Sequence, residues 1–311
     1  NLHFRCKEEV DETSSLLFWR CPLSEQTQEF RIERDSLGEV LVPRDALYGA
    51  QTQRAVVNFP VSGLRPWRAF IWSMAAIKRA AADVHRDLGL LGEQQADAIS
   101  AAAAEVMNGL WDAHFVVDPF QAGAGTSHNM NINEVIANRA SMLLGGSLGE
   151  YRVHPNDHVN MSQSTNDVYP TAIRITLSKL LDELMVNMTI LQRSLASKGK
   201  EFADVIKMGR TQLQDAVPMT LGQEFEAYSI MVAEDIERVR EAQALIREIN
   251  MGATAIGTGL NAHPDYARLV TANLRRLTGI PVKEAQNLVE ATQDAGAYVQ
   301  LAGVLKRLAS K

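Results

Sequence analysis

The 311-residue sequence contains little of what marks a disulfide-bonded, metal-binding or nucleic-acid-binding protein. Its two cysteines, Cys6 and Cys21, both lie within the first 21 residues, so no disulfide framework is expected. There is no CxxC pair and no histidine-rich tract with metal-ligand spacing, so we expect no metal and no cofactor. A net charge of -6 argues against a nucleic-acid partner but not against a small anionic ligand.

Long apolar runs are also missing. No stretch is long enough to span a membrane, and no basic segment leads into a sustained apolar segment as in a signal peptide. Residues 1–29 show no clear hydrophobic period, and we interpret them as an unmatched, disordered extension. These features and the sparse cysteines predict a cytoplasmic protein without membrane contact.

The rest of the chain has the apolar spacing of helices, which predicts an all-α protein. Residues 31–43 are predicted to form a short hairpin or extended lead-in. The two longest predicted helices each have roughly 30 residues, or about 45 Å at the rise of an α-helix, and need partners along their length, as in a bundle. The helices are predicted over 67–88, 94–109, 130–144, 168–199, 220–250, 265–278 and 286–309.

Small polar residues gather in the breaks between these helices. The clusters cover 123–129, 154–167, 209–215 and 252–261. Hydroxyl and amide side chains at a helix N-terminus cap the free N–H groups or bind an anion. One such cluster is more often a cap than a site, but several uncharged donor sets brought together would suit a dicarboxylate whose charge grows during reaction.

The same clusters carry a family resemblance. The segments "VPRDALYGAQTQRAVVNF", "QAGAGTSHNMNINEVIANRA", "HPNDHVNMSQSTNDVYPTAIRI", "GRTQLQDAVPMTLGQEF" and "GATAIGTGLNAHPDYA" resemble, in this order, the signatures of the aspartase/fumarase superfamily. The resemblance implies a long-helix bundle with a smaller N-terminal helical domain. It places an N-terminal lyase domain at 30–165 and a truncated central bundle at 166–311, without a C-terminal domain.

Within the superfamily, the pair Gln212-Leu213 and the "GAGTS" cluster resemble the aspartases. The implied reaction is the reversible elimination of ammonia from L-aspartate to give fumarate, through an aci-carboxylate intermediate. Two alternatives stay open. The first is a class II fumarase, which eliminates water, and the second is a non-catalytic helical scaffold that lacks the general base.

The resemblance also implies roles for individual residues. Thr126 would hold a substrate carboxylate, and Ser164 and Thr165 would bind the aci-carboxylate. Asn166 would line the site and help to hold the substrate. For each of these residues, helix capping is the structural alternative.

Further roles concern other segments. Thr211 would contact the substrate, and Gln212 stands where fumarases carry a histidine. His154, Asn156 and Asp157 correspond to a secondary anion site, although a histidine in such a loop is more often structural.

One expected motif is missing from the sequence. The superfamily's base is a serine in a loop of the type Gly-Ser-Ser-x-Met-Pro-x-Lys-x-Asn-Pro, and no such loop occurs here. We expect it beyond Lys311, so no catalytic residue is predicted within the chain. The resemblance further implies a homotetramer, in which several chains contribute to each site.

Overall fold

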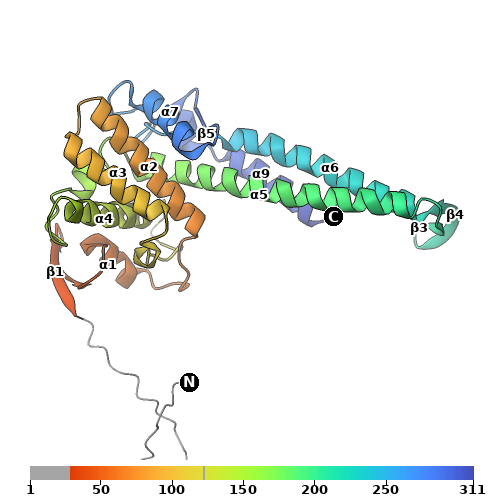
Figure 1. The fold of residues 1–311 in the computed structure, drawn as a ribbon, viewed down its shortest axis with the longest axis horizontal. Helices are drawn as coiled ribbons and strands as arrows, with labels where there is room; N and C mark the ends of the chain where they lie inside the picture. The colour runs from red at the N-terminus through yellow and green to blue at the C-terminus, as the bar shows by residue number, and fades with distance from the viewer. Residues whose placement is uncertain (1–28, 122) are drawn as a thin grey trace, which may run out of the picture.

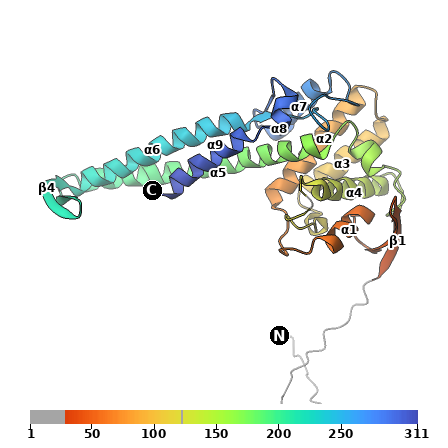
Figure 2. The same cartoon turned by 180° about the vertical axis from the view of Figure 1, so that it is seen from behind.

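The computed structural model describes residues 29–121 and 123–311, so the extension predicted over residues 1–29 lies outside the described residues except for Glu29. The described chain is mostly helical, which confirms the predicted all-α class, and its strands form only two-stranded ribbons (Figure 1). The helices build a compact end and a long arm, and the view from behind shows the same division (Figure 2). None of the described helices combines the length and the apolar character that a membrane crossing needs.

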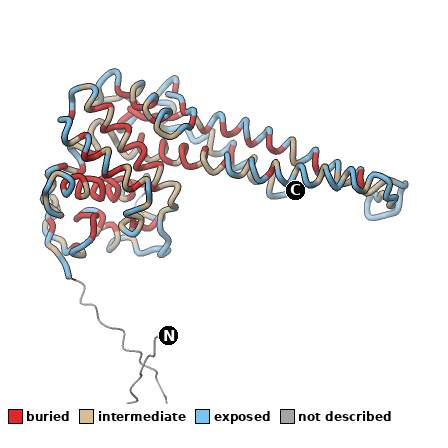
Figure 3. Tube along the Cα trace, in the orientation of Figure 1, coloured by how far each residue is buried: buried red, intermediate tan, exposed pale blue. Residues whose placement is uncertain are grey.

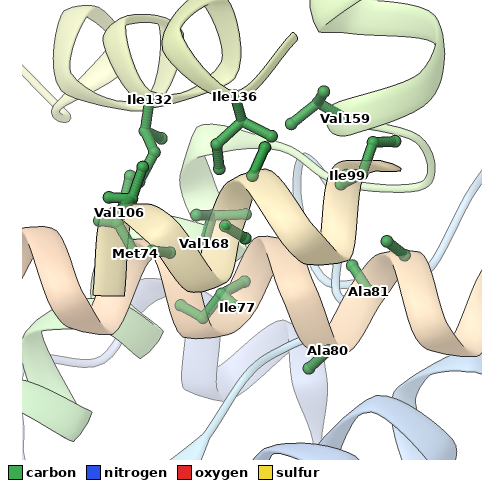
Figure 4. Packing of buried hydrophobic residues seen from close by; sticks show 14 of the residues in the cluster. Met74, Ile77, Ala80, Ala81, Ile99, Val106, Ile132, Ile136, Val159 and Val168 are labelled. Atoms are coloured by element: carbon green, nitrogen blue, oxygen red, sulfur yellow. The ribbon is translucent and has the colours of Figure 1, made fainter. Parts of the chain in front are cut away.

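The compact end is built on α2 (Arg68–Asp87), α3 (Glu93–Met107) and α4 (Thr126–Leu143). Its core contains Ile77, Ile99 and other apolar side chains that interdigitate between these helices (Figure 4). Small residues allow the helix backbones to approach closely, and larger side chains such as Met74 fill the remaining space. The fully buried alanines of α2 and α3 are Ala75, Ala76, Ala80, Ala96, Ala102 and Ala103.

A short N-terminal unit packs on α4. It consists of the antiparallel hairpin of β1 (Phe30–Asp35) and β2 (Gly38–Pro43), followed by α1 (Ala50–Asn58), a helix that the sequence did not predict. The buried Glu134 carboxylate of α4 caps α1 by accepting three backbone N–H groups. These belong to Gly49 at 2.8 Å, Gln51 at 3.0 Å and Thr52 at 3.1 Å.

The long arm consists of α5 (Thr165–Glu201) and α6 (Leu221–Ile246), which run side by side away from the compact end (Figure 1). The helices approach closely at Gly222, where a Cβ atom would lie only 2.5 Å from the carbonyl oxygen of Gly199. Pro170 lies inside α5 and leaves the Asn166 carbonyl without its helical donor, since proline has no N–H.

A hairpin closes the far end of the arm. It is formed by β3 (Ile206–Thr211) and β4 (Gln214–Thr220), which pair antiparallel with a bulge between Met208 and Arg210. The cluster 209–215 therefore lies in a break between two helices, as predicted, but in a β-hairpin and not at a helix N-terminus. Two turn residues, Gln212 and Leu213, join the strands, and α6 starts only after the second strand ends.

The chain returns from the arm to the compact end through β5 (Glu248–Ile249). This strand pairs in parallel with β6 (Lys283–Glu284), and α7 (Tyr266–Thr278) lies between them in sequence. Tyr266 and Val270 of α7 are fully buried in the core of the compact end. That core therefore combines residues from both sides of position 165, and the domain boundary proposed there stays a prediction.

The prediction of one continuous helix over 286–309 is wrong. The structure divides it into α8 (Leu288–Gln293) and α9 (Gly296–Ala309). Asp294 adopts an extended conformation, and its side chain accepts the Gly296 N–H at 2.8 Å, so local hydrogen bonding replaces the helical pattern. Helix α9 then lies along α5 and α6, where its Leu301 is buried (Figure 2).

Burial differs between the two parts of the molecule. The compact end contains most of the buried residues, whereas buried positions on the arm follow one narrow seam (Figure 3). Leu181, Met188 and Val239 lie in this seam, as the helical spacing of apolar residues over 168–199 and 220–250 predicts. Other apolar side chains of the arm are exposed, among them Val186, Ile190, Leu191, Ile230 and Leu245.

His85 makes the stability of the compact end sensitive to pH. Its ring is fully buried and stacks on Tyr266 at 4.8 Å, and no described residue hydrogen-bonds either ring nitrogen. Burial lowers the pKa of His85 to about 4, so the folded state keeps the ring neutral. Because the unfolded chain binds a proton near the ordinary pKa of about 6.5, this contribution to stability is complete above that pH and is lost as the pH falls toward the folded pKa.

We therefore expect His85→Phe, which keeps an aromatic ring on Tyr266, to reduce the pH dependence of unfolding. The histidine should account for about 2 kcal/mol of the unfolding free energy lost between about pH 7 and pH 5. Urea unfolding of wild type and variant at both pH values measures this difference. Equal losses in the two proteins would exclude His85 as the source.

Candidate active site

The start of α5 brings several predicted site residues together. Ser164 is the N-cap, and its hydroxyl oxygen accepts the Asn166 backbone N–H at 3.2 Å. Asp167 completes a capping box by accepting the Ser164 N–H at 2.9 Å. Ser164 therefore caps the helix, as the structural alternative requires. Accepting an N–H occupies only a lone pair, so the serine hydroxyl keeps its own hydrogen for a ligand.

A loop that is distant in sequence fixes this helix start. The Asn166 side chain donates to the Ala255 carbonyl at 2.7 Å, and the Asp167 carboxylate accepts the N–H groups of Gly252 at 3.2 Å and Thr254 at 3.0 Å. Burial raises the pKa of Asp167 to about 6, while these N–H donors act in the opposite direction. The "GATAIGTG" segment thus holds the first turn of α5 in place.

A buried lysine lies behind the same turn. Lys78 of α2 is fully buried, and its ammonium group donates to three amide oxygens. These are Asn129 Oδ1 at 2.8 Å, Asn160 Oδ1 at 2.9 Å and Gln163 Oε1 at 2.9 Å. The sequence analysis did not single out Lys78. The sequence feature that could have pointed to Lys78 is its position on the apolar stripe of a helix, three and four residues from apolar neighbours.

Thr126 lies at the first position of α4, after Gly125 in the left-handed conformation with φ of 88°. A Cβ atom on Gly125 would come within 2.2 Å of the Tyr169 ring, so the close approach of α4 to α5 requires glycine here. Asn129, one turn further along α4, reaches the Thr165 hydroxyl at 3.4 Å. Residues three apart share a helix face, so Thr126 lies on the side of α4 that faces the start of α5.

Thr211 and Gln212 are not part of this group within one chain. Both are exposed at the tip of the β3–β4 hairpin, beyond the far end of α5 (Figure 1). The 37 residues of α5 correspond to about 55 Å of helix, far more than a four-carbon dicarboxylate can span. One chain therefore presents two separate sets of candidate residues.

The predicted secondary anion residues lie at η2 (Pro155–Val159), a single turn of π-helix whose N-cap is His154. His154 caps this turn by accepting the Asp157 N–H at 3.2 Å, and its ring also lies 3.1 Å from the Asp157 carboxylate. Asn156 and Asp157 are exposed. These contacts show a local structural use for His154, and the anion-binding role stays a prediction.

The chemistry available at the start of α5 is that of hydrogen-bond donation to an anion. The helix N-terminus, two hydroxyl groups and a buried ammonium supply donors and positive potential without an exposed cation. Within residues 29–121 and 123–311, no cluster of three or more metal-ligating side chains is present.

Comparison with known proteins identifies the class. The lyase family profile matches residues 38–311, and the chain belongs to this family, in the aspartase/fumarase superfamily. It is 50% identical over 279 residues to the aspartate ammonia-lyase of Bacillus sp and 53% identical over 285 residues to that of Pseudomonas aeruginosa. These alignments cover 89% and 90% of the chain and 60% of each relative. The chain thus spans about three fifths of the length of these relatives.

Other members are similar as well. The class II fumarate hydratase of Halobacterium salinarum is 48% identical over 85% of the chain and 57% of its own length. A solved structure of a fumarate lyase:delta crystallin from Brucella melitensis superposes with a TM-score of 0.89 at 50% identity, covering 91% of this chain and 62% of that one. The structure of recombinant class II fumarase from Schistosoma mansoni superposes with a TM-score of 0.88 at 34% identity, covering 91% of this chain and 63% of that one.

Proposed function

We propose that the chain is part of an aspartate ammonia-lyase, which converts L-aspartate reversibly to fumarate and ammonia. The observation that carries this proposal is the group of uncharged donors at the start of α5, above the buried Lys78. The choice of L-aspartate rests on Gln212-Leu213 and on the similarity to aspartate ammonia-lyases. Small dicarboxylates are the substrate class of the superfamily.

In the proposed mechanism, removal of a proton next to a carboxylate converts that group into an aci-carboxylate with two negative charges. Ser164 and Thr165 donate to its oxygens, and the N-terminal dipole of α5 stabilises the growing charge. Thr126 holds the other carboxylate, and Asn166 orients the substrate from the side of the 252–257 loop. We assign the role of general base to none of these residues.

Thr211 and Gln212 enter the proposed site from other chains. The length of α5 keeps them away from Ser164 of their own chain, so a complete site requires assembly. The exposed apolar side chains of the arm, such as Ile190 at 58% and Ile230 at 55% exposure, supply surface for that assembly. We propose a homotetramer in which the arms pack together.

The test is the substrate preference of the complete protein. We expect fumarate release from L-aspartate with a kcat/KM well above that from L-malate. A clear preference for malate would support the class II fumarase alternative, which the similarity to the Halobacterium salinarum enzyme favours. Dicarboxylate binding without turnover of either compound would leave the non-catalytic scaffold as the remaining hypothesis.

A further inference from the structure

The orientation of the amide groups around Lys78 is fixed by hydrogen-bond chemistry. An ammonium group has three donors and no acceptor, so each neighbouring amide must turn its oxygen toward the lysine. The three contacts of Lys78, at 2.8 to 2.9 Å, use all three hydrogens. The amide nitrogens of Asn129, Asn160 and Gln163 therefore face away from the lysine.

The orientation of the Asn129 amide determines the direction of a hydrogen bond in the candidate site. Its nitrogen lies 3.2 Å from Asn160 Oδ1 and 3.4 Å from the Thr165 hydroxyl oxygen. An amide NH₂ can only donate, so the threonine oxygen accepts from Asn129. No described residue accepts the hydrogen of the Thr165 hydroxyl. That hydrogen is free for a ligand in front of the α5 N-terminus.

The charge of Lys78 is well placed to strengthen this donor. The side chain is fully buried, and a buried charge acts through a low effective dielectric on hydrogen bonds joined in series. Burial lowers the pKa of Lys78 to about 7, while the nearby Asp167 carboxylate acts to raise it. Three oxygen acceptors at hydrogen-bond distance favour the protonated form, because a neutral amine has only two hydrogens to donate.

We propose that Lys78 is a positioning residue for the proposed reaction. Through Asn129 it makes the Thr165 hydroxyl an outward donor, and its buried positive charge strengthens that donor. The inference rests on the proposed function, because it assumes that this carboxylate binds at the start of α5. Lys78 itself does not contact the substrate.

The relay is tested by the binding of succinate, a dicarboxylate without a leaving group, to variants of the complete protein. We expect Lys78→Met and Thr165→Val each to weaken binding about 10-fold to 100-fold, the range for one charge-assisted hydrogen bond. The double variant should bind about as weakly as Thr165→Val alone, because both changes break one chain of donors. Losses that multiply in the double variant would overturn the relay.

Asn129→Leu is the second test, in case Lys78→Met does not fold. It removes the link without adding charge, so it should weaken succinate binding like Thr165→Val and show the same lack of additivity with it. Wild-type affinity in Asn129→Leu would contradict the proposal. Lys179→Met is the matched control, since this lysine of α5 lies over the Trp72 ring, 4.5 Å from its centroid, and should leave affinity unchanged.

The outcomes separate the two proposals. Absence of succinate binding in the wild-type protein would contradict the proposed function itself. Normal binding in the wild type and in a folded Lys78→Met variant would overturn only the role of Lys78. Thermal melting of each variant shows whether a loss of binding reflects a loss of fold.

Discussion

Two inactive variants of the complete protein, Ser164→Ala and Thr211→Val, are expected to regain about a quarter of wild-type activity when they assemble together in equal amounts. Loss of one donor to a developing oxyanion costs about 10²-fold to 10³-fold in kcat, so Ser164→Ala should be nearly inactive alone. In mixed assemblies, a site is intact when the start of α5 comes from a Thr211→Val chain and the hairpin from a Ser164→Ala chain. Random assembly gives this combination in about one site in four.

The measurement is fumarate release by the co-expressed variants, compared with each variant alone. Ser164→Ala mixed with Thr165→Val is the matched control. Both defects lie in the same segment, so every site in that mixture remains defective and no recovery is expected. If Ser164→Ala and Thr211→Val also fail to recover although mixed oligomers form, the two segments do not meet across chains.

Glu134→Ala is expected to lower the free energy of unfolding by about 4 kcal/mol, because a buried donor left without an acceptor costs roughly 1–3 kcal/mol. The carboxylate accepts three N–H groups at the start of α1, of which the Gln51 N–H is only partly buried. Its loss should detach α1 from α4. Urea unfolding gives the free energy, and faster hydrogen exchange at residues 49–53 would locate the change.

Two comparisons sharpen this test. Glu134→Gln keeps one carbonyl oxygen at the same position and should lose less stability than the alanine variant. Glu150→Ala removes an exposed glutamate whose partner, Arg152, is also exposed, so little change is expected. If Glu134→Ala unfolds at the same urea concentration as wild type, the capping contacts do not stabilise the protein.

The sequence predicted the long helices well because their information is local. The apolar residues that step by threes and fours from Ile173 to Leu195 predict α5, which starts at Thr165, three residues before the predicted start. The four predicted residues Thr126, Ser164, Thr165 and Asn166 lie at the starts of two adjacent helices, as a helix-terminus site requires. Their proposed roles in substrate binding remain predictions.

Other features depend on contacts between distant residues and could not be predicted from local patterns. The nine-residue helix α1 owes its cap to Glu134, 82 to 85 residues away in sequence. The β3–β4 hairpin turns at Gln212 and Leu213, both with positive φ, although neither is the glycine or asparagine that usually marks such a turn. In the sequence Lys78 is an ordinary helical lysine, because its three amide partners lie more than 50 residues away and only the fold brings them to it.

Pro170 leaves one rung of the α5 hydrogen-bond ladder open. A helix bends most readily where a rung of its hydrogen-bond ladder is missing, and here the Asn166 carbonyl accepts from the Asn250 side chain at 3.1 Å instead. The turn that carries Ser164 and Thr165 is thus held from outside its own helix, and α5 stays anchored beyond Pro170, because Ala172 and Ile175 lie in the core of the compact end. Any bending of the arm must therefore occur beyond Ile175, so the hairpin tip can adjust to neighbouring subunits while the hydroxyl groups keep their positions.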